Sequence, residues 1–206
     1  MKFSHRSYNV VLLPPEDVSK EAIRLSELVA KSFLVEFVLD GKTRYPHLTL
    51  YQLEVPDKNL SVVKKQLSNI FKSTITAKFN HYFGAQNGFL SWDCPRNKKL
   101  FDVHKEVVKS LNQIREGLLL PSKKLKYNHL TDRDYLQIEK FGSSGLFEHF
   151  RPHITITRLK RGDNYNKALK ILPHKKPLIV NLKKAVLGKL SIHGTVSGII
   201  EEFNLS

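Results

Sequence analysis

The sequence predicts a two-lobed fold of repeated α/β units, because one residue pattern occurs twice and strand-like and helix-like segments surround both copies. Residues 45–53 read YPHLTLYQL and residues 151–159 read RPHITITRL, so both copies contain Pro-His-apolar-Thr-apolar followed by a leucine. Their histidines, His47 and His153, lie 106 residues apart (153 minus 47), about half of the 206-residue chain. A solenoid repeat is much shorter, roughly 20–50 residues. We therefore expect one unit used twice.

The composition is that of a globular protein. Hydrophobic residues make up 41% and charged residues 26% of the chain, close to the averages for soluble domains. A chain of this length can bury a core without disulfide bonds. We expect one two-lobed domain over residues 1–206, with one motif in each of the halves 1–96 and 97–206. Cys94 is the only cysteine, so it cannot form an intramolecular disulfide or a cysteine-based zinc site.

The sequence has no pattern typical of a membrane span or of a secretory signal. The apolar run from Val10 to Leu13 ends at two prolines, far short of the ~20 residues that a span needs. The first eight residues, MKFSHRSY, lack the apolar region of a signal peptide. Together with the single cysteine, these observations predict a cytoplasmic protein with no membrane partner.

The charge balance indicates a polyanionic partner. Lysine and arginine number 34 against 19 acidic residues, which gives a formal net charge of +15. A domain this basic attracts RNA, DNA, phosphorylated metabolites or acidic membrane surfaces. The alternative is a basic surface that only keeps the protein soluble, since charge alone names no partner.

Hydrophobic periodicity places strands and helices around both motifs. Alternating patterns predict strands at 8–13, 46–55, 74–82, 89–94, 152–158, 178–190 and 195–203. Patterns near 3.6 residues predict helices at 19–33, 57–73, 98–119, 132–141 and 164–172. Turn residues at 84–88 join two of these strands, and Pro121 closes the long helix.

The repeated motif places a histidine and a threonine on one face of a strand. Side chains in a strand alternate, so His47 and Thr49 project together, as do His153 and Thr155. A histidine has a pKa near 6.5, so one ring can accept a proton while a second donates one near neutral pH. Threonine hydroxyls can donate to phosphate oxygens, where negative charge must be held. The pattern therefore indicates phosphodiester chemistry without a metal or other cofactor.

The two motifs resemble the signature of the two-histidine (2H) phosphoesterases, a pair of His-x-Thr/Ser-apolar motifs about half a chain apart. Residues 150–156, FRPHITI, look very like the family's C-terminal motif. The resemblance implies a bilobal α+β fold, a duplicated unit with two antiparallel sheets flanking a central cleft and helices on the outside. It also implies that His47 and His153 are catalytic and that Thr49 and Thr155 bind phosphate. Family members act on 2′,3′-cyclic or 2′-5′-linked ribonucleotide phosphates, which makes RNA or a nucleotide the expected partner.

A single His-x-Thr is a weak signal, as residues 128–132 (NHLTD) show. Polar residues follow this third copy, so we interpret it as a loop that enters a helix with Thr131 or Asp132 as N-cap. Two alternatives to catalysis remain for the paired motifs. The histidines can simply satisfy local hydrogen bonds, or they can bind a metal, although neither motif carries an acidic third ligand at an adjacent position on the same face.

Several other residues are candidates for substrate binding, each with a plainer structural role as the alternative. Tyr51 should share the face of His47 by strand alternation, whereas Arg158 should face away unless the strand twists. Arg151 and Arg158 can neutralise phosphate charge, and Trp92 or Tyr127 can stack on a base. We expect His104 to be a structural residue on the apolar stripe of its helix.

We therefore expect a hydrolase, a metal-independent phosphodiesterase that acts as a monomer on 2′,3′-cyclic or 2′-5′-linked RNA phosphates. The alternative is an RNA-binding module of the same fold with little or no turnover. The sequence leaves open which histidine is the acid, whether hydrolysis or ligation is the physiological direction, and which substrate is the natural one.

Overall fold

The computed structural model describes residues 4–124, 130–174 and 176–206. The elements are β1 (His5–Leu13), α1 (Glu16–Ser32), β2 (Leu48–Pro56), α2 (Leu60–Ile70), β3 (Ile75–Phe79), β4 (Tyr82–Gly84), β5 (Phe89–Asp93), α3 (Lys98–Asn112), α4 (Asp132–Phe141), β6 (His153–Arg158), α5 (Tyr165–Ile171), β7 (Leu178–Leu182), β8 (Lys184–Leu190) and β9 (Val196–Asn204).

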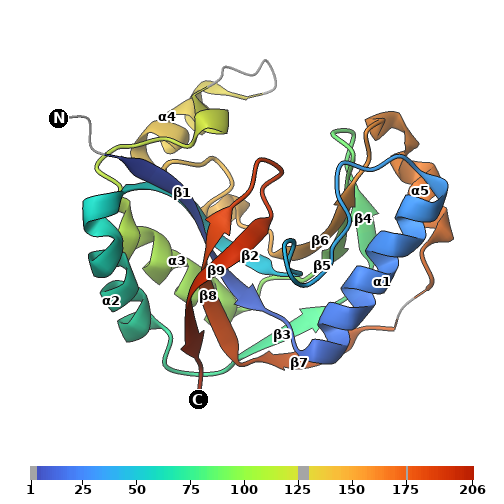
Figure 1. Cartoon of the computed structure of the whole chain (residues 1–206), viewed down its shortest axis with the longest axis horizontal. Helices are drawn as coiled ribbons and strands as arrows, with labels where there is room; N and C mark the ends of the chain where they lie inside the picture. Colours follow the sequence, from blue (N-terminus) through green and yellow to red (C-terminus); the bar gives the residue numbers. More distant parts are fainter. Residues whose placement is uncertain (1–3, 125–129, 175) are drawn as a thin grey trace.

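Seven strands form one antiparallel sheet in the order β4-β5-β6-β2-β1-β8-β9. The sheet has two arms, β4-β5-β6 and β2-β1-β8-β9, which meet where Leu48 of β2 pairs with Ile154 of β6. Both arms contain strands from both halves of the sequence. The second half contributes β6 to one arm and β8-β9 to the other, so the two motif strands become neighbours at the junction (Figure 1).

Helices cover the two arms, and a small second sheet lies across one end. Helices α1 and α5 pack against the β4-β5-β6 arm, while α2 and α3 pack against the other arm (Figure 1). Strands β3 and β7 pair antiparallel, with Ile75 opposite Leu182 at one end and Phe79 opposite Leu178 at the other. The α+β class that the sequence predicts is therefore confirmed. The two expected sheets are the two arms of one continuous sheet, joined by the short β2–β6 contact.

Apolar alternation on the strands and apolar stripes on the helices build one main core across both arms. Val10, Leu12, Leu48 and Ile154 are fully buried in it. Burial on this scale holds the strands that carry the motifs in a fixed register, because a slip of one residue would turn the apolar set to solvent.

Most of the expected segments differ in their ends, and three of these differences are informative. Helix α1 begins at Glu16, directly after Pro15, three residues before the expected start. The strand expected over 74–82 is divided between β3 and β4, and that expected over 178–190 is divided at Lys183 between β7 and β8. In both cases the chain leaves one sheet and enters the other, which alternation of side chains does not reveal.

The helix expected over 98–119 ends at Asn112, because Glu116 and Gly117 have positive φ angles of 52° and 74° that interrupt helical geometry. Helix α4 has the expected bounds. Thr131 is its N-cap in a capping box with Asp134, and Gly142 ends the helix with φ 82°. Within the described residues, no helix is both long enough and apolar enough to cross a bilayer.

Candidate active site

The two His-x-Thr segments lie side by side at the junction of the two arms. The paired residues Leu48 and Ile154 each sit between the histidine and the threonine of their own motif. Continuing this antiparallel register by one residue on each side sets His47 opposite Thr155 and Thr49 opposite His153. The junction thus gathers two imidazoles and two hydroxyls in a crossed arrangement.

His47 lies just before β2 and is 6% exposed. Its Nδ1 lies 2.6 Å from the carbonyl oxygen of Tyr45. A carbonyl can only accept, so Nδ1 carries the proton and Nε2 presents a lone pair. Burial lowers the pKa of His47 from 6.5 to about 4, the Tyr45 carbonyl acts against this change, and His153 adds to the lowering. The ring of His47 is therefore neutral at pH 7.

His153 repeats the same local contact. Its Nδ1 donates to the carbonyl oxygen of Arg151, two residues earlier, at 2.8 Å. Burial lowers its pKa and Asp93 acts in the opposite direction. The ring meets that of Phe83 edge to face, with centroids 5.7 Å apart. In both motifs a proline precedes the histidine, and Nδ1 of the ring donates to the carbonyl oxygen two residues before it.

The two threonines are half-buried beside the rings. The side-chain amide of Asn9, on β1, donates to Oγ1 of Thr49 at 3.3 Å and lies 3.5 Å from Nε2 of His47. Asn9 thus links the two polar side chains of the first motif. Thr155 faces Ser91 across the β5–β6 pair.

Each motif strand contains a β-bulge three residues after its histidine. In the β1–β2 pair Val11 lies opposite Thr49 and Val10 lies opposite Tyr51, so Leu50 has no partner and is the extra residue. Opposite β5 the register passes from Thr155 to Thr157, so Ile156 is the extra residue. A bulge reverses the alternation that follows it. The duplicated unit therefore includes the bulge as well as the His-x-Thr segment.

The bulges change which residues share the face of the histidines. Tyr51 does not share the strand face of Thr49, because Tyr51 pairs with Val10 while Thr49 pairs with Val11, and Val10 and Val11 point to opposite sides of the sheet. Tyr51 nevertheless lines a pocket together with Thr49 and His153. Gln52 takes the place of Tyr51 on the site face. In the second motif Arg158 takes this place, contrary to the expectation that it faces away, and Thr157 turns into the core.

Tyr51 holds α4 in place. Its ring is fully buried and its hydroxyl donates to the carbonyl oxygen of Phe141, at the end of α4, at 2.7 Å. Burial raises the pKa of this hydroxyl to about 12. Arg115 is 2% exposed and donates to the carbonyls of Glu139 and Lys140 in the same helix end. The two side chains fix the segment that follows α4 beside the junction.

A pocket of about 120 Å³ opens between this segment and the motif strands. Thr49, Gln52, Ser143, Arg151 and His153 provide its polar lining. The pocket is too small for a whole nucleotide, but it suits a phosphate or part of a sugar. A larger pocket of about 560 Å³ lies on the other side of Arg151, which lines both.

The remaining candidates for substrate binding, Arg158, Trp92 and Tyr127, differ in their positions. The guanidinium of Arg158 is held on the site face by the carbonyl of Asn87 at 3.1 Å and by the ring of Phe89 at 5.0 Å. Trp92 does not reach the site, because it is fully buried and its indole N–H donates to the carbonyl of Asn80 at 3.3 Å. Of the two roles considered for Trp92, its burial supports the packed strand aromatic and not the base-stacking residue. Tyr127 lies outside the described residues.

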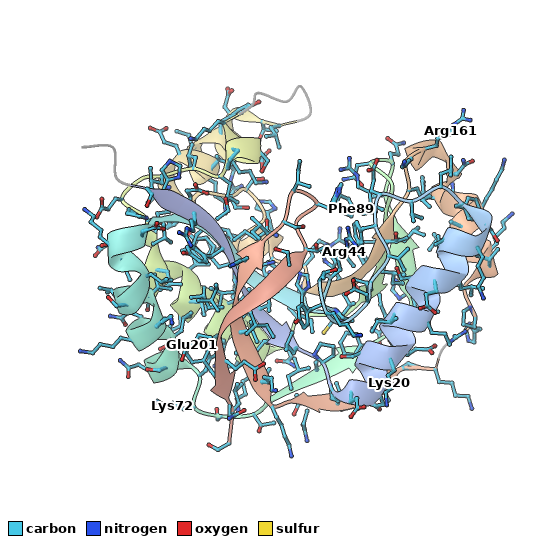
Figure 2. The ribbon with its side chains drawn as sticks, viewed as in Figure 1. Lys20, Arg44, Lys72, Phe89, Arg161 and Glu201 are labelled. Atoms are coloured by element: carbon cyan, nitrogen blue, oxygen red, sulfur yellow. The ribbon has the colours of Figure 1, made fainter. Side chains whose placement is uncertain are left out.

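Sequence reasoning missed five residues on this face of the sheet: Asn9, Gln52, Phe83, Phe89 and Asp93. A polar residue inside an apolar strand marks Asn9, and this signal is visible in the sequence. The other four depend on the strand order and on the bulges. Figure 2 shows the labelled side chains of Arg44 and Phe89 between the two arms, whereas Arg161 lies at the outer edge. Among the described residues, no group of three or more His, Cys, Asp and Glu is arranged to hold a metal.

No protein-family model matches the sequence, and no curated protein matches it at the sequence level. Several solved structures share the fold. The crystal structure of Escherichia coli LigT complexed with 3′-AMP has a TM-score of 0.59 and 14% sequence identity, covering 98% of this chain and 99% of LigT. The crystal structure of TT0787 from Thermus thermophilus has a TM-score of 0.58 and 16% identity, covering 96% of this chain and 97% of TT0787.

A crystal structure described as a phosphoesterase has a TM-score of 0.54 and 11% identity, again over 98% of this chain. These likenesses cover both arms, so the whole chain takes part in the match. The chain therefore has the LigT fold, and the resemblance to the 2H phosphoesterases that its two motifs predict is confirmed at the level of the fold.

Proposed function

We propose that the protein is a phosphodiesterase that acts on 2′,3′-cyclic or 2′-5′-linked ribonucleotide phosphates through the acid–base pair His47 and His153. The observation that carries the proposal is the crossed arrangement at the β2–β6 junction, with both Nδ1 atoms tied to backbone carbonyls. Two imidazoles that present Nε2 to one face can serve one phosphate together, one at the attacking oxygen and the other at the leaving oxygen.

The reaction needs two proton transfers. A neutral imidazole takes a proton from the attacking water as its oxygen bonds to phosphorus. The bond from phosphorus to the leaving ribose oxygen breaks, and the protonated imidazole gives its proton to that oxygen. Thr49 and Thr155 donate to the non-bridging oxygens, where charge develops. The histidines exchange protonation states in the process, and solvent resets them. The protein groups themselves supply both transfers, so we expect activity without added metal.

The charge of the chain and the lining of the site favour a ribonucleotide substrate. Arg151 and Arg158 place guanidinium groups near the junction, and the net charge is +15. Phe83 and Phe89 give the β4-β5-β6 arm apolar rings on the same face. Crystal structures of LigT, which shares the fold, are described with 3′-AMP, NADP⁺ and ATP bound.

The first experiment measures hydrolysis of 2′,3′-cyclic nucleotides and 2′-5′-linked oligoribonucleotides, with and without EDTA. We expect turnover that EDTA does not abolish. The phosphate end of the product, 2′ or 3′, identifies the bond that is cut. His47→Ala and His153→Ala should each reduce kcat/KM by at least ~10²-fold, because each removes one proton transfer.

The matched control is His174→Ala, which removes an exposed histidine far in sequence from both motifs and should keep the wild-type rate. Circular dichroism must show that all three variants fold. A wild-type rate in either motif variant would refute the assignment of the site. Binding of RNA that weakens with salt, without turnover of any of these substrates, would favour a binding module of the same fold.

A further inference from the structure

We propose that Asp93 and Asn9 divide the two proton transfers between the histidines, so that His153 is the general acid and His47 the general base. This inference rests on the proposed function and adds to it the direction of proton flow. Asp93 and Asn9 touch no reacting atom of the substrate. They are positioning residues that act by setting the protonation of the two histidine rings.

One charged neighbour of His153 favours an imidazolium, against the burial that lowers the pKa of the ring. Asp93, on β5, is the residue directly opposite His153 in the β5–β6 register. A carboxylate in this position favours the charged ring. Arg151, on the same chain segment, acts in the opposite direction, and His47 is the other titratable neighbour. Arg151 is exposed, so water screens its charge.

The surroundings of His47 favour a neutral ring. Its side-chain neighbour is the amide of Asn9, which carries no charge and is fully buried. The Tyr45 carbonyl fixes Nδ1, and the charged or titratable group that acts on His47 is His153. Burial without a carboxylate disfavours the protonated form. The two motifs are equivalent in sequence, but their neighbouring strands supply a carboxylate to one and an amide to the other.

Asn9 can hold the ring of His47 in both protonation states. Its Nδ2 faces Nε2, whereas its Oδ1 is buried without a hydrogen-bond partner among the described residues. Amide nitrogen and oxygen exchange places when the group turns by half a rotation. In that orientation Oδ1 accepts from the protonated Nε2, and the Thr49 hydroxyl keeps its single proton for the phosphate. The neutral amide of Asn9 can therefore contact Nε2 of His47 both before and after this ring takes the proton from water.

The test is an isotope-edited NMR titration of the two imidazoles combined with the pH dependence of kcat/KM. In the free protein His153 should gain its proton at a higher pH than His47. Asp93→Asn, which keeps the shape of the side chain, should lower the midpoint of His153 by about 1 pH unit and leave that of His47 almost unchanged. The alkaline limb of the rate profile should move to lower pH by the same amount, because the acid must be protonated.

Asn9→Asp is the reciprocal variant. It should raise the midpoint of His47 and move the acidic limb to higher pH, because the base must be unprotonated. Glu106→Gln removes an exposed carboxylate on α3 and is the control for net charge; it should move neither limb.

Movement of the acidic limb in Asp93→Asn would reverse the two roles and overturn the proposal, as would an unchanged midpoint of His153. Absence of turnover in the wild type would instead count against the proposed function. In that case the NMR titration still tests whether Asp93 and Asn9 give the two rings different protonation midpoints.

Discussion

At the scale of single residues, His47 and His104 show how similar burial produces different roles. Burial lowers the pKa of both to about 4. Nδ1 of His104 donates to the carbonyl of Leu50 at 2.8 Å, and its Nε2 accepts from the backbone N–H of Phe147 at 3.0 Å. Both nitrogens of His104 are thus committed to the backbone, which confirms its expected structural role. His47 keeps Nε2 for a ligand or for Asn9.

His104 should make stability depend on pH. The folded pKa lies below the unfolded value of 6.5, so its contribution is complete above pH 6.5 and is lost as the pH falls towards 4. His104→Phe leaves two backbone groups without partners and should lower the free energy of unfolding by about 2–5 kcal/mol at pH 8. The difference from wild type should shrink by about 2 kcal/mol at pH 5.

Urea unfolding at pH 8 and pH 5 measures both values. His81→Gln, which alters an exposed histidine, is the control and should follow the wild-type curve. A constant difference between His104→Phe and wild type across this range would contradict a neutral, buried His104.

The residues that sequence could identify are those with a local pattern. His47, Thr49, His153 and Thr155 follow from alternation within one strand. Asp93 does not, because its relation to His153 comes from the pairing of β5 with β6, and strand pairing is a property of the tertiary structure.

At the scale of elements, the bulges at Leu50 and Ile156 explain the errors of side-chain direction. Alternation predicts side-chain direction correctly up to the bulge and incorrectly after it. Tyr51 therefore leaves the face predicted for it, and Arg158 lies on the face that it was expected to reach only if the strand twists. Element type was predictable because apolar periodicity determines it. The divided strands were not, because the chain changes sheets without a change in periodicity.

The loop after β6 packs closely on the β4–β5 turn. This turn holds Arg158 through the carbonyl of Asn87. A Cβ on Gly162 would lie 2.0 Å from the carbonyl oxygen of Gln86. Gly162→Ala should therefore push these segments apart and lower the free energy of unfolding by about 1–3 kcal/mol. It should also raise KM more than it lowers kcat, since Asn87, which holds Arg158, belongs to the displaced turn.

Chemical denaturation and steady-state kinetics check this pair of effects. Gly198→Ala is the control, because a Cβ there meets a side-chain carbon of Lys189 at an ordinary 3.8 Å. Equal stability of Gly162→Ala and Gly198→Ala would show that the turn adapts without cost.

At the scale of the whole molecule, the interleaved strand order turns a duplicated sequence into one site. Each half supplies one motif strand, and the exchange of β6 against β8-β9 between the arms brings these two strands together. The repeat in the sequence predicted two related units, but their interleaving depends on strand pairings between distant residues and could not be read from either copy.

The net charge of +15 belongs to the whole molecule and determines the expected salt dependence. Arg96 and Arg151 line the larger pocket beside the site, so an RNA chain can meet cations beyond the reacting phosphate. An oligoribonucleotide contacting four phosphates should lose about 50-fold in kcat/KM between 50 and 200 mM salt, whereas a 2′,3′-cyclic mononucleotide should lose about 3-fold. Initial rates at low substrate concentration measure both slopes. Equal slopes would show that the protein reads a single phosphate, and the physiological substrate would then be a nucleotide instead of an RNA chain.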